Sequence, residues 1–102
     1  EIYTLSLHDA LPISIVSGTE RDRAECLNGT GIALYALGRY EQAVTAYRQA
    51  LDLYRDLPGS ERDRAACSYN ISAALHKTGR HEEALAFYQQ AQEIYPQPDG
   101  GQ

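Results

Sequence analysis

The chain superimposes on itself when it is shifted by 41 residues, and this internal repeat limits the possible folds more than any other feature of the sequence. Residues 18–54 and 59–95 are identical at 17 of 37 positions, whereas unrelated sequences would share roughly two. The identities include a Glu-Arg-Asp-Arg-Ala run, a cysteine and a Gly-Arg pair, each at the same place in both units. A repeat of this length predicts a supersecondary unit that buries its apolar face by stacking on its own copies.

Within each unit the apolar residues follow a helical period. They recur three and four positions apart, in a first run that ends near residues 37 and 77 and a second run that begins near residues 40 and 81. Gly38 and Gly79 directly follow the first runs and suit the left-handed C-cap of a short turn. The expected fold class is therefore all-α, with two stacked antiparallel helical hairpins that form part of an α-solenoid.

Polar residues and turn formers mark the ends of the units. Thr19 and Ser60 each precede an aspartate by three residues, which is typical of a helix N-cap. The Leu-Pro-Gly run at 57–59 should break the chain between the units, and Pro96 should end the last helix. The expected organisation is a residual loop from a preceding repeat over residues 14–20, a first repeat over 21–57, a second repeat over 58–97 and a C-terminal loop over 98–102.

The first 13 residues differ in kind from the repeats. Their order matches one reading frame of a common short-read sequencing adapter. They lack the basic start of a signal peptide, and His8 and Asp9 would interrupt its apolar core. The chain also contains no methionine. We therefore interpret residues 1–13 as adapter-derived and the remainder as a stretch of a longer repeat array.

Composition argues against several classes of partner. Nine Lys and Arg against fourteen Asp and Glu give a formal net charge of −5, whereas phosphate binding needs concentrated basic residues, so nucleic acid is not an expected partner. Hydrophobic residues make up 43% and charged residues 23%, which is ordinary for a globular chain and does not suggest a membrane protein. Cysteine usage and the lack of a signal sequence favour a cytoplasmic location.

Groups that could carry chemistry are few. Cys26 and Cys67 occupy equivalent places in successive repeats, where stacked helices would hold their Cα atoms about 10 Å apart, so we expect two small buried thiols and no disulfide. No Cys or His pair has the spacing of a zinc site. His76 and His81 flank a turn and are interpreted as solvated helix-end residues. The sequence therefore predicts no enzyme activity, no catalytic residue, no metal and no cofactor.

Each unit resembles a tetratricopeptide repeat (TPR). The resemblance covers residues 18–97 and rests on glycines, small residues and tyrosines in the order and spacing of the motif: Gly31, Gly38, Tyr40, Ala43, Tyr47, Ala50 and Leu51 in the first unit, and Asn70, Ile71, Ser72, Gly79, Ala84, Tyr88, Ala91 and Pro96 in the second. Small residues such as Gly31 and Ala43 suit a close approach of two helices, and Tyr47 adds bulk at the seam. The 41-residue spacing exceeds the usual length of about 34, as in the longer-helix subclass.

The resemblance implies that the first helices of both units line a concave groove for a peptide or partner protein. The groove candidates are Glu25, Asn28, Ile32 and Tyr35 from the first unit and Tyr69, Asn70, Ala73 and His76 from the second. Asparagine can both donate to and accept from a peptide backbone, and tyrosine offers flat contact area with a polar tip. Lys77 is the only basic residue near this set, so a clamp for a C-terminal carboxylate is not evident.

Three functions are compatible with the sequence. The leading hypothesis is a non-enzymatic scaffold that binds a peptide or partner segment in the groove. Alternatively, the repeats form the sensor or regulatory part of a larger regulator or enzyme whose activity lies elsewhere. A third hypothesis is self-association through an uncovered stripe on the last helix, formed by Ala84, Tyr88, Ala91 and Tyr95.

Overall fold

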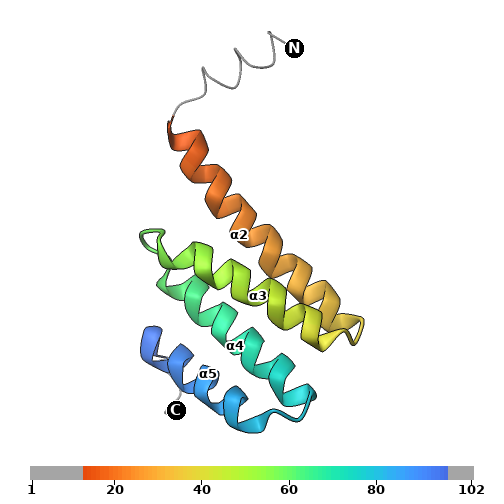
Figure 1. Cartoon of the computed structure of the whole chain (residues 1–102). Helices are drawn as coiled ribbons and strands as arrows, with labels where there is room; N and C mark the ends of the chain where they lie inside the picture. The colour runs from red at the N-terminus through yellow and green to blue at the C-terminus, as the bar shows by residue number, and fades with distance from the viewer. Residues whose placement is uncertain (1–12, 97–102) are drawn as a thin grey trace.

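The computed structural model describes residues 13–96. This part of the chain contains no strand and consists of helices α2 (Ile13–Ala36), α3 (Tyr40–Arg55), α4 (Glu61–Lys77) and α5 (His81–Ile94). Successive helices run in opposite directions and lie side by side in chain order (Figure 1). The predicted all-α fold with two stacked helical hairpins is confirmed.

The stack is curved. Helix α2 packs on α3, α3 on α4 and α4 on α5. Helices α2 and α4 also contact each other, whereas α3 and α5 do not within the described part of the chain. The first helices of the two hairpins therefore lie closer together than the second helices, and α2 and α4 occupy the inner side of the curve.

The two hairpin turns share one geometry. Gly38 and Gly79 have φ values of +82° and +85°, in the left-handed region that glycine adopts without steric cost. The next backbone N–H in each turn, that of Arg39 and of Arg80, donates to the carbonyl oxygen of Leu34 (2.8 Å) and of Leu75 (3.0 Å) respectively. This bond satisfies a carbonyl at the end of the helix, and the predicted glycine C-caps are confirmed.

The core lies along the seam between the two hairpins. Tyr47 and Tyr54 of α3 are each 2% exposed, and Ile71 and Leu75 of α4 are fully buried. Each such burial stabilises the fold by about 1.5–3 kcal/mol. Gly31 lets α2 approach α3, because a Cβ at this position would lie 2.5 Å from Cε1 of Tyr47. The prediction of a small residue at this close approach is confirmed.

Helix α2 is longer than predicted. It begins at Ile13 and continues through residues 14–20, so the expected loop over 14–20 and the expected N-cap at Thr19 are wrong. Pro12 directly precedes the helix, and proline is compatible with the first turn of a helix. A single glycine at position 18 costs only about 1 kcal/mol in a helix and does not end it. Residues 1–12 of the segment interpreted as adapter-derived, and the loop expected over 98–102, lie outside the described residues.

Ser60 stands at the N-cap of α4 but does not cap the helix. Its ψ of 14° differs from the extended conformation that an N-cap side chain needs, and its hydroxyl makes no bond to the first turn. Instead, the hydroxyl donates to the carbonyl oxygen of Tyr54 at 2.5 Å, and Ser60 is 2% exposed. The capping prediction is wrong at this position, and the residue ties the end of α3 to the start of α4.

Candidate functional site

The eight groove candidates lie on the inner pair of helices. Glu25, Asn28, Ile32 and Tyr35 belong to α2, and Tyr69, Asn70, Ala73 and His76 belong to α4. None of the eight is buried: four are exposed and the two asparagines and two tyrosines are partly exposed. We call the surface that these eight residues form the inner face. Its polar and aromatic groups are accessible to a partner.

Two amides join α2 and α4 across the inner face. The Nδ2 of Asn70 donates to the Oδ1 of Asn28 at 3.1 Å, and the same oxygen lies 3.8 Å from the Sγ of Cys67. The amide group of Asn28 and the carbonyl oxygen of Asn70 make no further side-chain hydrogen bond among the described residues. Each asparagine is partly exposed, so the amide nitrogen of Asn28 and the carbonyl oxygen of Asn70 remain available as one donor group and one acceptor.

Each aromatic candidate on the inner face contacts the helix that follows it. The ring of Tyr35 meets that of Tyr40 edge to face with centroids 5.2 Å apart, and Tyr69 meets Tyr88 at the same distance. Edge-to-face pairs of this kind contribute about 0.5–1.5 kcal/mol beyond the area that they bury. The pairs therefore hold the two tyrosines of the inner face in fixed orientations.

The two histidines form a pair of the same kind. Their ring centroids are 4.4 Å apart, and the Nδ1 atoms of His76 and His81 lie 2.6 Å apart, close enough for a hydrogen bond with one nitrogen as donor. In the 41-residue register they correspond to Tyr35 and Tyr40, which pair in the first repeat. Both histidines are exposed, as predicted for helix-end residues.

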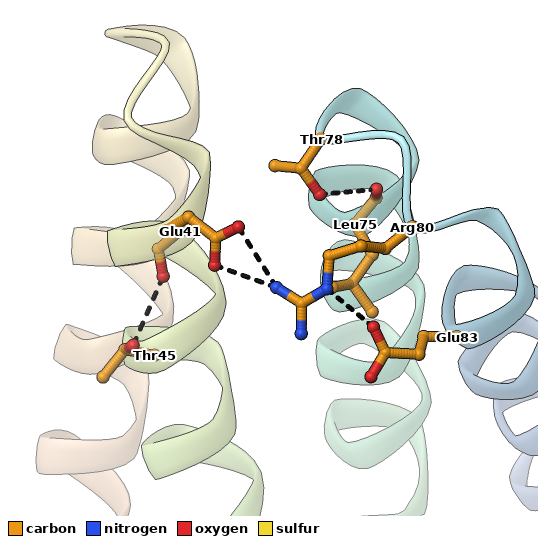
Figure 2. Close-up of polar contacts among 6 residues, drawn as sticks. All are labelled: Glu41, Thr45, Leu75, Thr78, Arg80 and Glu83. Atoms are coloured by element: carbon orange, nitrogen blue, oxygen red, sulfur yellow. Dashed lines mark hydrogen bonds and ion pairs between the residues drawn. The ribbon is translucent and has the colours of Figure 1, made fainter.

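An arginine connects the two repeats at the hairpin turns. The Nη1 of Arg80 donates to both carboxylate oxygens of Glu41 on α3, at 2.9 and 3.1 Å, and its Nε donates to Glu83 at 2.6 Å (Figure 2). The hydrogen bond from Arg80 lowers the pKa of Glu83, and the two carboxylates, Glu83 foremost, raise the pKa of Arg80. We call this three-residue contact the arginine clasp.

A second arginine connects the repeats at the opposite end of the helices. The Nη2 of Arg21 on α2 donates to the carbonyl oxygen of Pro58 at 3.0 Å, and its Nη1 lies 3.6 Å from the carboxylate of Asp63 on α4. Exposed ion pairs of this kind contribute little to stability individually. This contact and the arginine clasp thus join the two repeats at opposite ends of the helices.

The buried ionisable groups are not prepared for catalysis. Burial, with a smaller effect from Asp63, raises the pKa of the Cys67 thiol to about 12, so the thiol is protonated at neutral pH and a poor nucleophile. Burial likewise raises the pKa of Tyr54 to about 12. Among residues 13–96, no three His, Cys, Asp or Glu side chains converge in a way that could hold a metal ion.

The expectation of two buried thiols is half correct. Both cysteines are free, and Cys67 is buried, but Cys26 is exposed. The two occupy the same place in their repeats, yet α4 lies between α3 and α5, whereas α2 has a hairpin on one side only in the described part of the chain. The position of a helix in the stack therefore decides the burial of its cysteine.

Sequence reasoning missed the arginine clasp. A signal for it exists, because the Gly-Arg pair and the glutamate two residues after the arginine occur in both repeats, at 38–41 and 79–82. What the pattern does not reveal is that the arginine of one repeat binds the glutamate of the other. That pairing becomes evident only when the stacking of α4 on α3 brings Arg80 close to Glu41.

Comparison with known proteins identifies one family. A family model described as "Tetratricopeptide repeat" matches residues 7–56 and 22–97, so the two matched segments together span most of the chain. A search of curated proteins finds no match. Within the described residues, no helix combines the length and the apolar character that crossing a membrane would require.

Proposed function

Because the chain belongs to the tetratricopeptide repeat family, whose members generally mediate protein–protein interactions, we propose that it is a non-enzymatic scaffold whose inner face binds an extended peptide segment of a partner protein. The observation that carries this proposal is the amide pair between Asn28 and Asn70. The pair presents one free donor and one free acceptor, which are the groups that would bind a backbone C=O and N–H of an extended chain.

The surroundings of the amide pair also suit a peptide. Ile32 is 52% exposed between the pair and the end of α2, and it offers an apolar contact for a partner side chain. Tyr35 and Tyr69 are held by their edge-to-face partners, so little conformational entropy would be lost when they bind. Glu25 and His76 at the two ends of the inner face add polar groups that a peptide could contact through water.

The test begins with a peptide ligand selected on the wild-type chain from a random phage-displayed library. Asn70→Ala and Tyr69→Ala should each raise the Kd of the selected peptide by about tenfold, measured by fluorescence anisotropy. Gln49→Ala is a matched control, because Gln49 is exposed on α3, outside the inner face. Circular dichroism confirms that each variant keeps its helix content. Unchanged affinity in both inner-face variants would refute the assignment.

A further inference from the structure

The two hairpins expose equivalent helix faces to very different degrees. On α3, which packs against both α2 and α4, Val44 and Tyr47 are 5% and 2% exposed. Their counterparts on α5, 41 residues later, are Leu85 and Tyr88, which are 56% and 43% exposed. The α5 face thus repeats the apolar surface that holds α4, with no described helix over it. A cleft of about 420 Å³ opens there, lined also by Ser72, His76, His81 and Ala84.

The opposite end of the stack exposes the complementary face. Three residues of α4, which lies between α3 and α5, are fully buried: Cys67, Ile71 and Ala74. The counterparts on α2 are Cys26, Thr30 and Ala33, and all three are exposed. Here a cleft of about 680 Å³ lies between α2 and α3. The chain therefore carries at its two ends the two surfaces that meet in its middle.

The charges at the two ends follow the same register. In the arginine clasp, Arg80 binds Glu41 at 2.9 Å. The counterpart of Arg80 in the first repeat is Arg39, and the counterpart of Glu41 in the second repeat is Glu82; both are exposed and make no ion pair in the described part of the chain. Figure 2 shows the geometry that such an ion pair requires: the Arg80 side chain reaches from the turn between α4 and α5 to Glu41 in the first turn of α3.

The second inter-repeat ion pair also has unpaired counterparts. Arg21 and Asp63 approach to 3.6 Å in the middle of the chain. The residues 41 positions away are Arg62 on the α4 side and Asp22 on the α2 side, both exposed. Two complementary charges thus stand at each end of the stack, at the positions that would oppose each other if the stack continued.

We propose that a second copy of this chain stacks head to tail on the first. Helix α2 of the second copy packs on α4 and α5 of the first copy, as α4 packs on α2 and α3 within one chain. Arg39 of the second copy then binds Glu82 of the first, and Asp22 of the second copy faces Arg62 of the first. The amide pair is not repeated, because Tyr69 and Gly29 stand at the corresponding positions, so this junction is weaker than the internal one. The two faces differ from each other, and association through them is open-ended.

Sedimentation velocity of the whole chain, from about 5 to about 500 µM, tests the proposal. The weight-average mass should rise steadily above 11.3 kDa with concentration and fall again in high salt. Glu82→Arg and Arg39→Glu should each weaken association about tenfold, because each places two like charges at the junction. The double reversal should restore the wild-type association constant to within about threefold.

Two further variants separate this interface from other causes. Asp56→Arg changes the net charge by the same amount as Glu82→Arg but lies in the turn after α3, outside both end faces, and should leave association unchanged. Leu85→Asp removes the apolar contact from an exposed position and should abolish association while circular dichroism stays the same. A folded wild-type chain that remains monomeric throughout would overturn the proposal, as would a double reversal that fails to restore association.

Discussion

Gly31 provides a quantitative test of the packing between α2 and α3. A Cβ at this position would lie 2.5 Å from Cε1, 2.6 Å from Cδ1 and 3.0 Å from Cζ of Tyr47, whereas carbon atoms pack at about 3.5–4.0 Å. Tyr47 is 2% exposed, so its ring has no open space into which it can turn. Gly31→Ala therefore forces the helices apart or the ring out of its rotamer.

The magnitude follows from two opposing effects. Overpacking a core costs about 1–3 kcal/mol, and three close ring atoms place this site near the upper limit. Alanine is favoured over glycine in a helix interior by about 1 kcal/mol, which offsets part of the cost. Gly31→Ala should lower the free energy of unfolding by about 2 kcal/mol, measured by urea denaturation followed by far-ultraviolet circular dichroism.

Gly29 supplies the matched control. It lies on the same helix, and an added Cβ there meets no atom within 4 Å. Gly29→Ala should raise the free energy of unfolding by about 1 kcal/mol, so the two variants should differ by about 3 kcal/mol. In a Tyr47→Leu background, Gly31→Ala should cost less because the ring is gone. If Gly31→Ala proves as stable as Gly29→Ala, the close approach of α2 to Tyr47 is wrong.

Further predictions concern the buried polar groups and the effect of acid. Cys26 should react rapidly with a disulfide reagent at pH 8 because it is exposed. Burial raises the pKa of Cys67 from 9.0 to about 12, so this thiol should hold about a thousandfold less thiolate than it would in the unfolded chain and react only after unfolding. Ser68→Ala should stabilise the fold by about 1 kcal/mol because its buried hydroxyl has no hydrogen-bond partner among the residues that the structure describes. Ser60→Ala should destabilise the fold by a similar amount because its hydroxyl is bonded; urea denaturation measures both effects. Since the pKa of Glu83 is lowered by its arginine partner, the folded chain binds fewer protons there, and stability should fall as the pH drops below about 4; Glu83→Gln should show a smaller decline.

The fold class was predictable because its determinants are local. The helical period, the glycine turns and the 41-residue repeat can all be read without knowing which helices touch. The helix ends were harder to predict where a residue had two possible hydrogen-bond partners. Ser60 could have bonded to the first turn of α4 or to the end of α3, and only the tertiary arrangement selects the carbonyl of Tyr54.

The contacts between repeats could not be predicted by aligning them. Equivalent residues are 41 positions apart, but the bonded pairs are not: Asn28 and Asn70 are 42 apart, and Glu41 and Arg80 are 39 apart. These offsets depend on the tilt and displacement of one hairpin relative to the next. An alignment therefore indicates which residue types recur at each repeat, while the structure is needed to show which of them meet.

The order of helix packing also sets how the chain opens. In the described part of the chain α5 contacts only α4, so releasing it breaks a single helix interface, whereas releasing α4 breaks the interfaces with its neighbours on both sides. In a linear stack of this kind, the helix at the end of the stack can open locally at a lower free-energy cost than global unfolding requires. Amide protons of α5 should accordingly exchange with solvent well before those of α4, and a partner bound over α5 would slow that exchange without touching the rest of the molecule.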